Sequence, residues 1–198
     1  SVKSLVEYKS LYKKSIEDPI GFWASQANEL RWFRKWDSIL RNDNGFYKWF
    51  EGGYLNVAYN CLDRHIEDGK GNKVALIWES ESGETKMFTF LQLLCEVNKL
   101  ANIIKANGVG KGDRVCIYLP MIPELLMSLL ACARIGAVHS VVFGGFSSDA
   151  IRDRVQDSDA KMIITSDGSF RNNVPLNLKD SVDKAAQECP TVEKILVV

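Results

Sequence analysis

Two adjacent glycines, Gly144 and Gly145, and the arginine Arg171 are the residues whose types and spacing best suit ligand binding. The glycines follow the apolar run 137–143 and precede Ser147 and Ser148, a pattern typical of a strand that turns into a helix. Adjacent glycines allow close backbone approach by a ligand or by a neighbouring helix. Arg171 follows the next apolar run, and its forked guanidinium suits a phosphate. We therefore expect a site for a phosphorylated ligand, with helix packing at the glycines and a solvated arginine as the alternative.

Other candidate chemistry in the chain is weaker. The run GVGKGDR at residues 108–114 is similar to a phosphate-binding loop, but it follows a helical pattern and precedes a strand, so it is predicted to be a turn. Asp63, Arg64 and His65 are sequence neighbours whose side chains diverge around a helix, which favours capping or ion pairing over catalysis. His139 lies within an apolar strand, where a core histidine is expected. No nucleophile and base form an evident pair.

The composition is that of a globular protein, with 46% hydrophobic and 25% charged residues. Lys+Arg 25 balance Asp+Glu 25, which argues against a nucleic-acid partner. The five cysteines have no C-x-x-C spacing, so we expect reduced, mostly buried thiols in a cytoplasmic protein and no metal site. The most apolar region, 125–146, is interrupted by Arg134, His139 and glycines, so a soluble protein with no membrane partner is predicted.

The elements that must position the glycines and Arg171 alternate regularly from residue 73 onward. Strands are predicted at 74–78 and 87–90 as a hairpin, and at 114–119, 137–143, 161–165 and 194–198. Thr89 and Gln92 form a capping box for a helix that Gly108 ends, and further helices are predicted over 124–135, from Ser147 or Ser148 to about 156, and over 178–188. Residues 166–175 are predicted to form a polar loop. This alternation predicts an α/β fold with a mostly parallel sheet covered on both faces.

The N-terminal residues differ from this pattern. Asp18 and Pro19 mark a helix start, the spacing of Leu55, Ala58, Leu62 and Ile66 is helical, and four of the five tryptophans lie at Trp23, Trp32, Trp36 and Trp49. Interleaved basic residues leave a nucleic-acid surface as an alternative, but we expect a helical or irregular arm that buries aromatic side chains against a larger body. The chain stops within the apolar run Ile195–Val198, which suggests a fragment of a longer protein.

Several runs of residues resemble the AMP-forming acetyl-CoA synthetases of the adenylate-forming superfamily. They are SIEDPIGFW at 15–23, WFEGGYLNVAYNCLDRH at 49–65, VALIWE at 74–79, GVGKGDRVCIYLPMIPE at 108–124, LLACARIGAVHSVVFGGFSSDAI at 129–151 and LKDSVDKA at 178–185. These runs are collinear over almost the whole chain. The resemblance implies a Trp-rich N-terminal arm at 1–62 and the first part of the AMP-binding (adenylation) domain, with its stacked, mostly parallel sheets, at 63–198.

The resemblance also implies an activity for the full-length protein. The family joins acetate to ATP, releases pyrophosphate, and transfers the acetyl group from acetyl-adenylate to CoA with release of AMP. ATP, CoA and acetate would be substrates and Mg²⁺ the metal. The family's ATP phosphate loop, its acidic Mg²⁺ motif and its catalytic lysine would lie beyond Val198, so residues 1–198 alone are expected to be inactive and to hold no catalytic residue. The remainder of the chain beyond Val198 would be their partner.

By motif matching, the family places the CoA nucleotide against the glycine turn and the loop after the next strand. The residues implied in CoA binding are Phe143, Gly144, Gly145, Arg171, Asn172, Asn173, Val174 and Leu176. The family carries two basic residues three apart around the CoA 3′-phosphate, whereas this chain has Arg171 and then Val174. A non-catalytic module that binds CoA or a protein, and a relative that prefers propionate, are the alternative functions.

Overall fold

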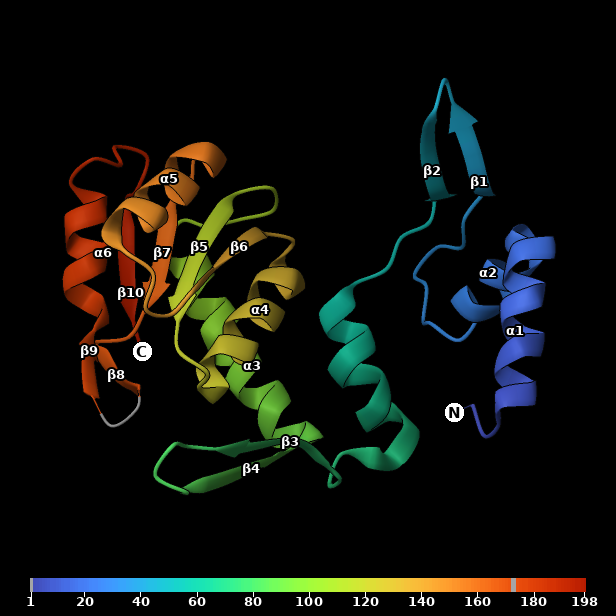
Figure 1. Ribbon diagram of the computed structural model, residues 1–198, viewed down its shortest axis with the longest axis horizontal. Coiled ribbons are helices and arrows are strands. Elements are labelled where there is room, and N and C mark those ends of the chain that lie inside the picture. The colour runs from blue at the N-terminus through green and yellow to red at the C-terminus, as the bar shows by residue number, and fades with distance from the viewer. Residues whose placement is uncertain (1, 172–173) are drawn as a thin grey trace. The chain divides into compact units, whose positions relative to one another are not determined.

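The computed structural model describes residues 2–171 and 174–198, which form two compact units, Ser1–Asn56 and Val57–Val198 (Figure 1). The smaller unit contains helices α1 (Leu5–Glu17) and α2 (Pro19–Ala27) and a hairpin of β1 (Ser38–Asp43) and β2 (Phe46–Glu51). Asp18 caps α2 through a hydrogen bond from the Gly21 N–H at 2.9 Å, as the Asp-Pro pair predicts.

The β1–β2 hairpin shows that the arm is more regular than predicted. Its strands are joined at Asn44 and Gly45, both with positive φ, which is the backbone that a two-residue Asn-Gly hairpin turn requires. Aromatic side chains of this unit contact one another: the ring centroid of Trp32 lies 5.0 Å from that of Trp36 and 5.6 Å from that of Phe50. The tryptophans therefore form a cluster within their own unit.

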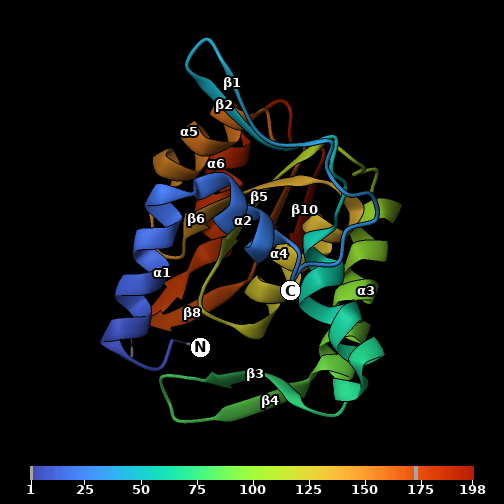
Figure 2. The ribbon, with the colours of Figure 1, turned by 90° about the vertical axis from the view of Figure 1, so that its right-hand side faces the viewer.

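The larger unit begins with a helical segment of residues 57–70 that includes the π-helical turns Tyr59–Asp63 and Ile66–Lys70. The helix predicted from Leu55 thus starts two residues later, and it buries Ala58 and Leu62. Strands β3 (Val74–Glu79) and β4 (Thr85–Thr89) then form the predicted antiparallel hairpin. Figure 2 shows the 57–70 segment beside the long helix α3 (Phe90–Ala106).

Helix α3 begins with the capping box that the sequence predicts. The Thr89 side chain accepts from the Gln92 N–H at 3.2 Å, and the Gln92 side chain accepts from the Thr89 N–H at 2.9 Å. Helix α4 (Pro123–Ile135) has proline in its first turn and ends at Gly136, whose φ of 76° is the left-handed conformation that favours glycine. The predicted start of α3 and the predicted end of α4 are therefore confirmed.

Four parallel strands form the central sheet of the described residues, in the order β10-β7-β5-β6. They are β5 (Arg114–Leu119), β6 (Val138–Phe143), β7 (Met162–Thr165) and β10 (Lys194–Val197). Helices α3 and α4 cover one face, and α5 (Ser148–Ser158) and α6 (Leu178–Ala186) cover the other (Figure 1). The predicted α/β architecture with a covered parallel sheet is therefore confirmed.

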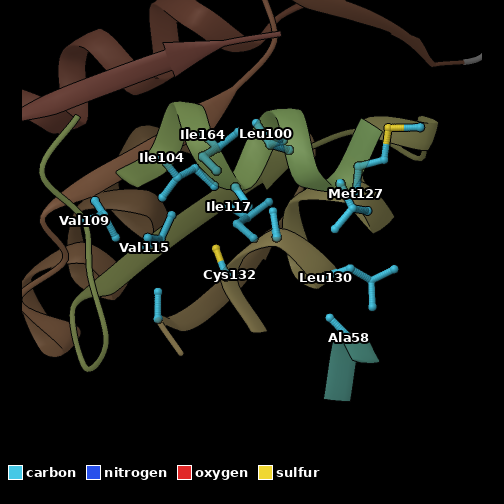
Figure 3. Packing of buried hydrophobic residues seen from close by; sticks show 14 of the residues in the cluster. Ala58, Leu100, Ile104, Val109, Val115, Ile117, Met127, Leu130, Cys132 and Ile164 are labelled. Carbon is cyan, nitrogen blue, oxygen red and sulfur yellow. The ribbon is translucent and has the colours of Figure 1, made fainter. Parts of the chain in front are cut away.

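The core follows from the alternation of side chains along β5. Val115, Ile117 and Leu119 enter the cluster under α3 and α4, where Figure 3 shows Val115 and Ile117 among Leu100, Ile104 and Leu130. Cys116 and Tyr118 point to the opposite cluster under α5 and α6. A central parallel strand is buried on both faces, which explains its uninterrupted apolar sequence.

Two predictions are wrong at the edges of this sheet. Residues 166–175 are not simply a polar loop, because β8 (Gly168–Arg171) and β9 (Val174–Asn177) pair as an antiparallel hairpin. His139 is exposed rather than in the core, because β6 is the last strand of the described sheet and has a neighbour on one side only. No helix within residues 2–171 and 174–198 is long and apolar enough to cross a membrane.

Candidate functional site

The glycine turn, residues 143–146, connects β6 to α5. The Phe146 N–H donates to the Phe143 carbonyl at 3.1 Å, which closes a four-residue turn with Gly144 and Gly145 at its centre. Gly145 has φ of 104°, close to the value that a type II turn needs at its third residue. Ser147 then caps α5 by accepting from the Ala150 N–H. The turn thus requires glycine at position 145 for its backbone conformation.

Gly144 is a glycine for a different reason. A Cβ atom at this position would lie 3.0 Å from the carbonyl oxygen of Leu119 and 3.2 Å from the Cα of Pro120. The turn therefore packs directly on the backbone that leaves β5. Gly144 therefore allows close packing within the protein. Gly145 is exposed and leaves its backbone accessible to a ligand.

The open side of Gly145 faces the β8–β9 hairpin. A Cβ atom at Gly145 would lie 3.6 Å from a terminal guanidinium nitrogen of Arg171 and 3.6 Å from Leu176. The guanidinium of Arg171 lies over the ring of Phe143, 5.9 Å from its centroid. The structure therefore brings together Phe143, Gly145, Arg171 and Leu176, which are separated by up to 33 residues in sequence (176 − 143).

Of the other residues predicted to bind CoA, the structure describes Val174 but not Asn172 and Asn173. Val174 is the cross-strand partner of Arg171, and its side chain is 58% exposed. Directly opposite residues of an antiparallel pair share one face of the hairpin, so a residue at position 174 lies beside Arg171. Asn172 and Asn173 lie outside the described residues.

Phe143, Gly144, Arg171 and Leu176 border a cavity of about 830 Å³ at the carboxyl ends of the strands. Its walls are the residues after β5, the end of β6 with Gly144, the β8–β9 hairpin with Arg171, and the tip of the β3–β4 hairpin. The carboxyl ends of parallel strands are where α/β proteins bind ligands, and this volume lies in the range of cofactor sites. We call this space the strand-end cavity.

Charge is distributed unequally around the strand-end cavity. Arg171 lies on one side, and no carboxylate of the described residues forms an ion pair with it. Glu79, Glu81 and Glu84 lie on the opposite side, at the tip of the β3–β4 hairpin. A polyanionic ligand is therefore favoured beside Arg171 and disfavoured beside the β3–β4 tip.

Trp78 fixes one wall of the cavity, a role that was not predicted from the sequence. Its indole N–H donates to the Met121 carbonyl at 2.6 Å and so joins β3 to the loop after β5, 43 residues away in sequence. Lys86 lies over the indole ring at 5.4 Å. No sequence pattern of Trp78 indicates this role, since its partner is a backbone atom of a distant loop.

The other residues considered for catalysis or phosphate binding have structural roles instead. Asp63 forms an ion pair with Arg134, with oxygen–nitrogen distances of 2.5 and 3.3 Å, so its predicted ion-pairing role is confirmed. Burial, with the nearby charges of Arg64 and Lys70, lowers the pKa of His65. The 108–114 run forms the predicted turn, in which the Gly110 N–H donates to the Asp113 side chain at 2.8 Å.

All five cysteines are free. Cys116, Cys132 and Cys189 are buried, and burial raises the pKa of both Cys116 and Cys132 to about 12. Such thiols stay protonated at neutral pH and are poor nucleophiles. Within residues 2–171 and 174–198, no three His, Cys, Asp or Glu side chains are placed to hold a metal ion.

Curated proteins similar to this chain are acetyl-coenzyme A synthetases. That of Campylobacter jejuni subsp. jejuni is 54% identical over 200 residues, covering 100% of this chain and 30% of the relative. That of Magnetococcus marinus is 51% identical over 196 residues, covering 97% of this chain and 30% of the relative. The chain thus spans about 30% of the length of the relatives it matches.

Structure and family comparisons agree with these relatives. The solved acetoacetyl-CoA synthetase from Streptomyces lividans is similar with a TM-score of 0.87 and 27% identity, covering 96% of this chain and 30% of that one. The family model for the acetyl-coenzyme A synthetase N-terminus matches residues 8–61, and that for AMP-binding enzymes matches residues 62–198. The chain therefore belongs to the family of AMP-binding enzymes, and residues 8–61 are similar to an acetyl-coenzyme A synthetase N-terminus.

Proposed function

We propose that the full-length protein is an acetate–CoA ligase that forms AMP. It joins acetate to ATP with release of pyrophosphate, and the thiol of CoA then attacks the acyl carbon of acetyl-adenylate, so that acetyl-CoA and AMP are the products. The observation that carries this proposal is the identity of 51–54% to acetyl-coenzyme A synthetases over essentially the whole chain. Residues 1–62 would be the N-terminal arm and 63–198 the first part of the adenylation domain.

Residues 1–198 would contribute part of the CoA site to this enzyme. The strand-end cavity supports this role, because it combines an exposed cation with apolar walls and an open glycine backbone. Arg171 would bind the 3′-phosphate of CoA, while Phe143, Gly144, Gly145 and Leu176 would line the adenine nucleotide. Asn172, Asn173 and Val174 would also bind CoA, with one basic residue fewer than the family pattern.

ATP, acetate and Mg²⁺ would bind mainly to parts of the protein outside residues 1–198. We place no catalytic residue and no Mg²⁺ ligand in this chain, and we expect residues 1–198 alone to be inactive. Five cysteines outside any disulfide support a cytoplasmic location. The substrates are small molecules, and the balanced charge favours neither nucleic acid nor an anionic membrane as a partner.

The test is a product assay on the purified full-length protein. With ATP, Mg²⁺, acetate and CoA, we expect acetyl-CoA, AMP and pyrophosphate in equal amounts, and acetate-dependent exchange of pyrophosphate into ATP without CoA. Parallel assays with propionate and acetoacetate would show which acid is preferred. Formation of ADP instead of AMP, or binding of CoA with no acyl transfer, would refute the ligase proposal and favour a non-catalytic CoA-binding module.

A further inference from the structure

Tyr118 lies directly beneath the glycine turn. It is the fifth residue of β5, it is 1% exposed, and its ring belongs to the cluster with Val142, Ile151 and Leu178 under α5 and α6. Its hydroxyl is nevertheless a polar group in an apolar surrounding, and such a group must be hydrogen-bonded to avoid a large desolvation cost. The partners of this hydroxyl therefore show what it does.

Both partners of the Tyr118 hydroxyl are backbone groups of the glycine turn. It accepts a hydrogen bond from the Gly145 N–H at 3.1 Å and donates its proton to the Phe146 carbonyl at 2.8 Å. A phenol has one proton to donate and a lone pair with which to accept, so both capacities are used on this turn. The hydroxyl is thus committed to holding the backbone of residues 145 and 146.

This contact selects the direction of the peptide bond between Gly144 and Gly145. The bond from the Phe146 N–H to the Phe143 carbonyl closes the turn in either a type I or a type II conformation, which differ by a flip of the central peptide. Only one of these directs the Gly145 N–H to Tyr118, and the positive φ of Gly145 shows that it is the one adopted. The hydrogen bond to Tyr118 therefore selects the type II conformation over the type I conformation.

The direction of the Gly145 N–H determines where the Gly144 carbonyl points. In a planar trans peptide the C=O and N–H bonds point in opposite directions, so the Gly144 carbonyl is directed away from Tyr118. Gly144 borders the strand-end cavity, and no residue of the segments 2–171 and 174–198 donates a hydrogen bond to its carbonyl. The turn thus offers a ligand a hydrogen-bond acceptor, while Arg171 offers a cation.

We propose that Tyr118 is a positioning residue for CoA, which fixes the Gly144–Gly145 peptide so that the Gly144 carbonyl accepts a hydrogen bond from an N–H group of the bound coenzyme. This inference rests on the proposed acetate–CoA ligase function. CoA is then recognised at two places. Its 3′-phosphate binds to the guanidinium of Arg171, and one of its N–H groups donates to the Gly144 carbonyl of the turn that Tyr118 holds.

The experiment compares Tyr118→Phe with the wild type in the full-length protein. Phenylalanine keeps the ring and the packing but removes both hydrogen bonds, so we expect KM for CoA to rise about tenfold, the factor that corresponds to ~1.4 kcal/mol. Acetate-dependent pyrophosphate exchange, which needs no CoA, should be unchanged. The matched control is Tyr59→Phe, which removes a hydroxyl bonded to Glu67 outside the cavity and should leave KM for CoA unchanged.

A second readout separates Tyr118 from Arg171. The preference for CoA over 3′-dephospho-CoA should be the same in Tyr118→Phe as in the wild type, because the phosphate contact is intact. An unchanged KM for CoA in Tyr118→Phe, or an equal loss of pyrophosphate exchange, would overturn the positioning role. Absence of ligase activity in the wild type would instead overturn the proposed function itself.

If Tyr118→Phe does not fold, Gly145→Ala tests the same peptide without altering the core. Its added methyl group would make only ordinary contacts, at 3.6 Å, so its main effect is strain at the positive φ that the Tyr118 hydrogen bond requires. We expect KM for CoA to rise, with the preference for CoA over 3′-dephospho-CoA as in the wild type. Normal KM for CoA in this variant would likewise overturn the inference.

Discussion

Arg171 and Val174 are direct cross-strand partners, the last pair of β8 and the first of β9 in the hairpin register. Because opposite residues of an antiparallel pair share one face, a basic side chain at position 174 would lie beside the guanidinium of Arg171. The family's two basic residues three apart thus correspond to a single cationic face in this fold. In this chain that face carries one positive charge and an exposed valine.

Replacing Val174 with arginine should strengthen CoA binding. We expect Val174→Arg to lower KM for CoA about three- to tenfold, since an exposed charge pair contributes roughly 0.5–1 kcal/mol and a fork on phosphate somewhat more. The gain should disappear with 3′-dephospho-CoA and shrink as salt is added. Val174→Gln, which adds length without charge, is the control, and an equal gain in this variant would contradict an electrostatic cause.

Removing the guanidinium of Arg171 should weaken CoA binding selectively. A charge-assisted contact to phosphate contributes roughly 1.5–3 kcal/mol, so we expect Arg171→Ala to raise KM for CoA between about tenfold and a hundredfold. Arg171→Lys should recover part of this loss, because it restores the charge but not the fork. Steady-state kinetics with CoA and 3′-dephospho-CoA provide the measurement. An unchanged KM for CoA would exclude Arg171 from the site.

Gly144→Ala should destabilise the protein more than its small size suggests. The added Cβ atom would lie 3.0 Å from the Leu119 carbonyl oxygen, and backbone cannot move aside as a flexible side chain can. We expect a loss of about 1–3 kcal/mol in the free energy of unfolding, typical of overpacking, measured by urea denaturation. Gly110→Ala is the matched control, since its nearest neighbour lies at 3.9 Å and its φ is not positive.

The ion pair of Asp63 and Arg134 should contribute more to stability than the exposed pairs of the chain. Its side chains are 22% and 23% exposed, whereas those of Lys13 and Glu17 are 72% and 64% exposed. We expect Asp63→Asn to cost roughly 1.5–3 kcal/mol, and Glu17→Gln less than about 1 kcal/mol. Thermal unfolding of both variants measures the difference, and equal losses would contradict the effect of burial.

The buried thiols should make the fold sensitive to alkaline pH. In Cys116 and Cys132 the folded state raises the pKa from 9.0 to about 12, so the neutral thiol is favoured by folding. Their contribution to the free energy of unfolding is therefore complete below pH 9 and is lost as the pH rises toward 12.

Iodoacetamide at pH 8 should label the exposed Cys61 and Cys95 quickly and the three buried cysteines only after denaturation. Rapid labelling of Cys116 in the folded protein would refute this.

Local sequence signals were sufficient for most of the elements and for their order. The Thr89–Gln92 capping box, the stop at Gly136 and the apolar run of β5 each depend on residues a few positions apart, so they could be predicted directly. Asn44-Gly45 is a signal of the same kind that would have predicted the β1–β2 hairpin. The resemblance in sequence likewise pointed to Phe143, Gly145, Arg171 and Leu176 as one site.

Tertiary structure decided how these residues act together. The placement of Arg171 over Phe143, the packing of Gly144 on Leu119 and the exposure of His139 all depend on which strand lies beside which. The hydrogen bonds of Tyr118 to the glycine turn join residues 27 and 28 positions apart. No periodicity encodes such contacts, because they arise only when β5 and β6 pair in parallel and bring their carboxyl ends to the same edge of the sheet.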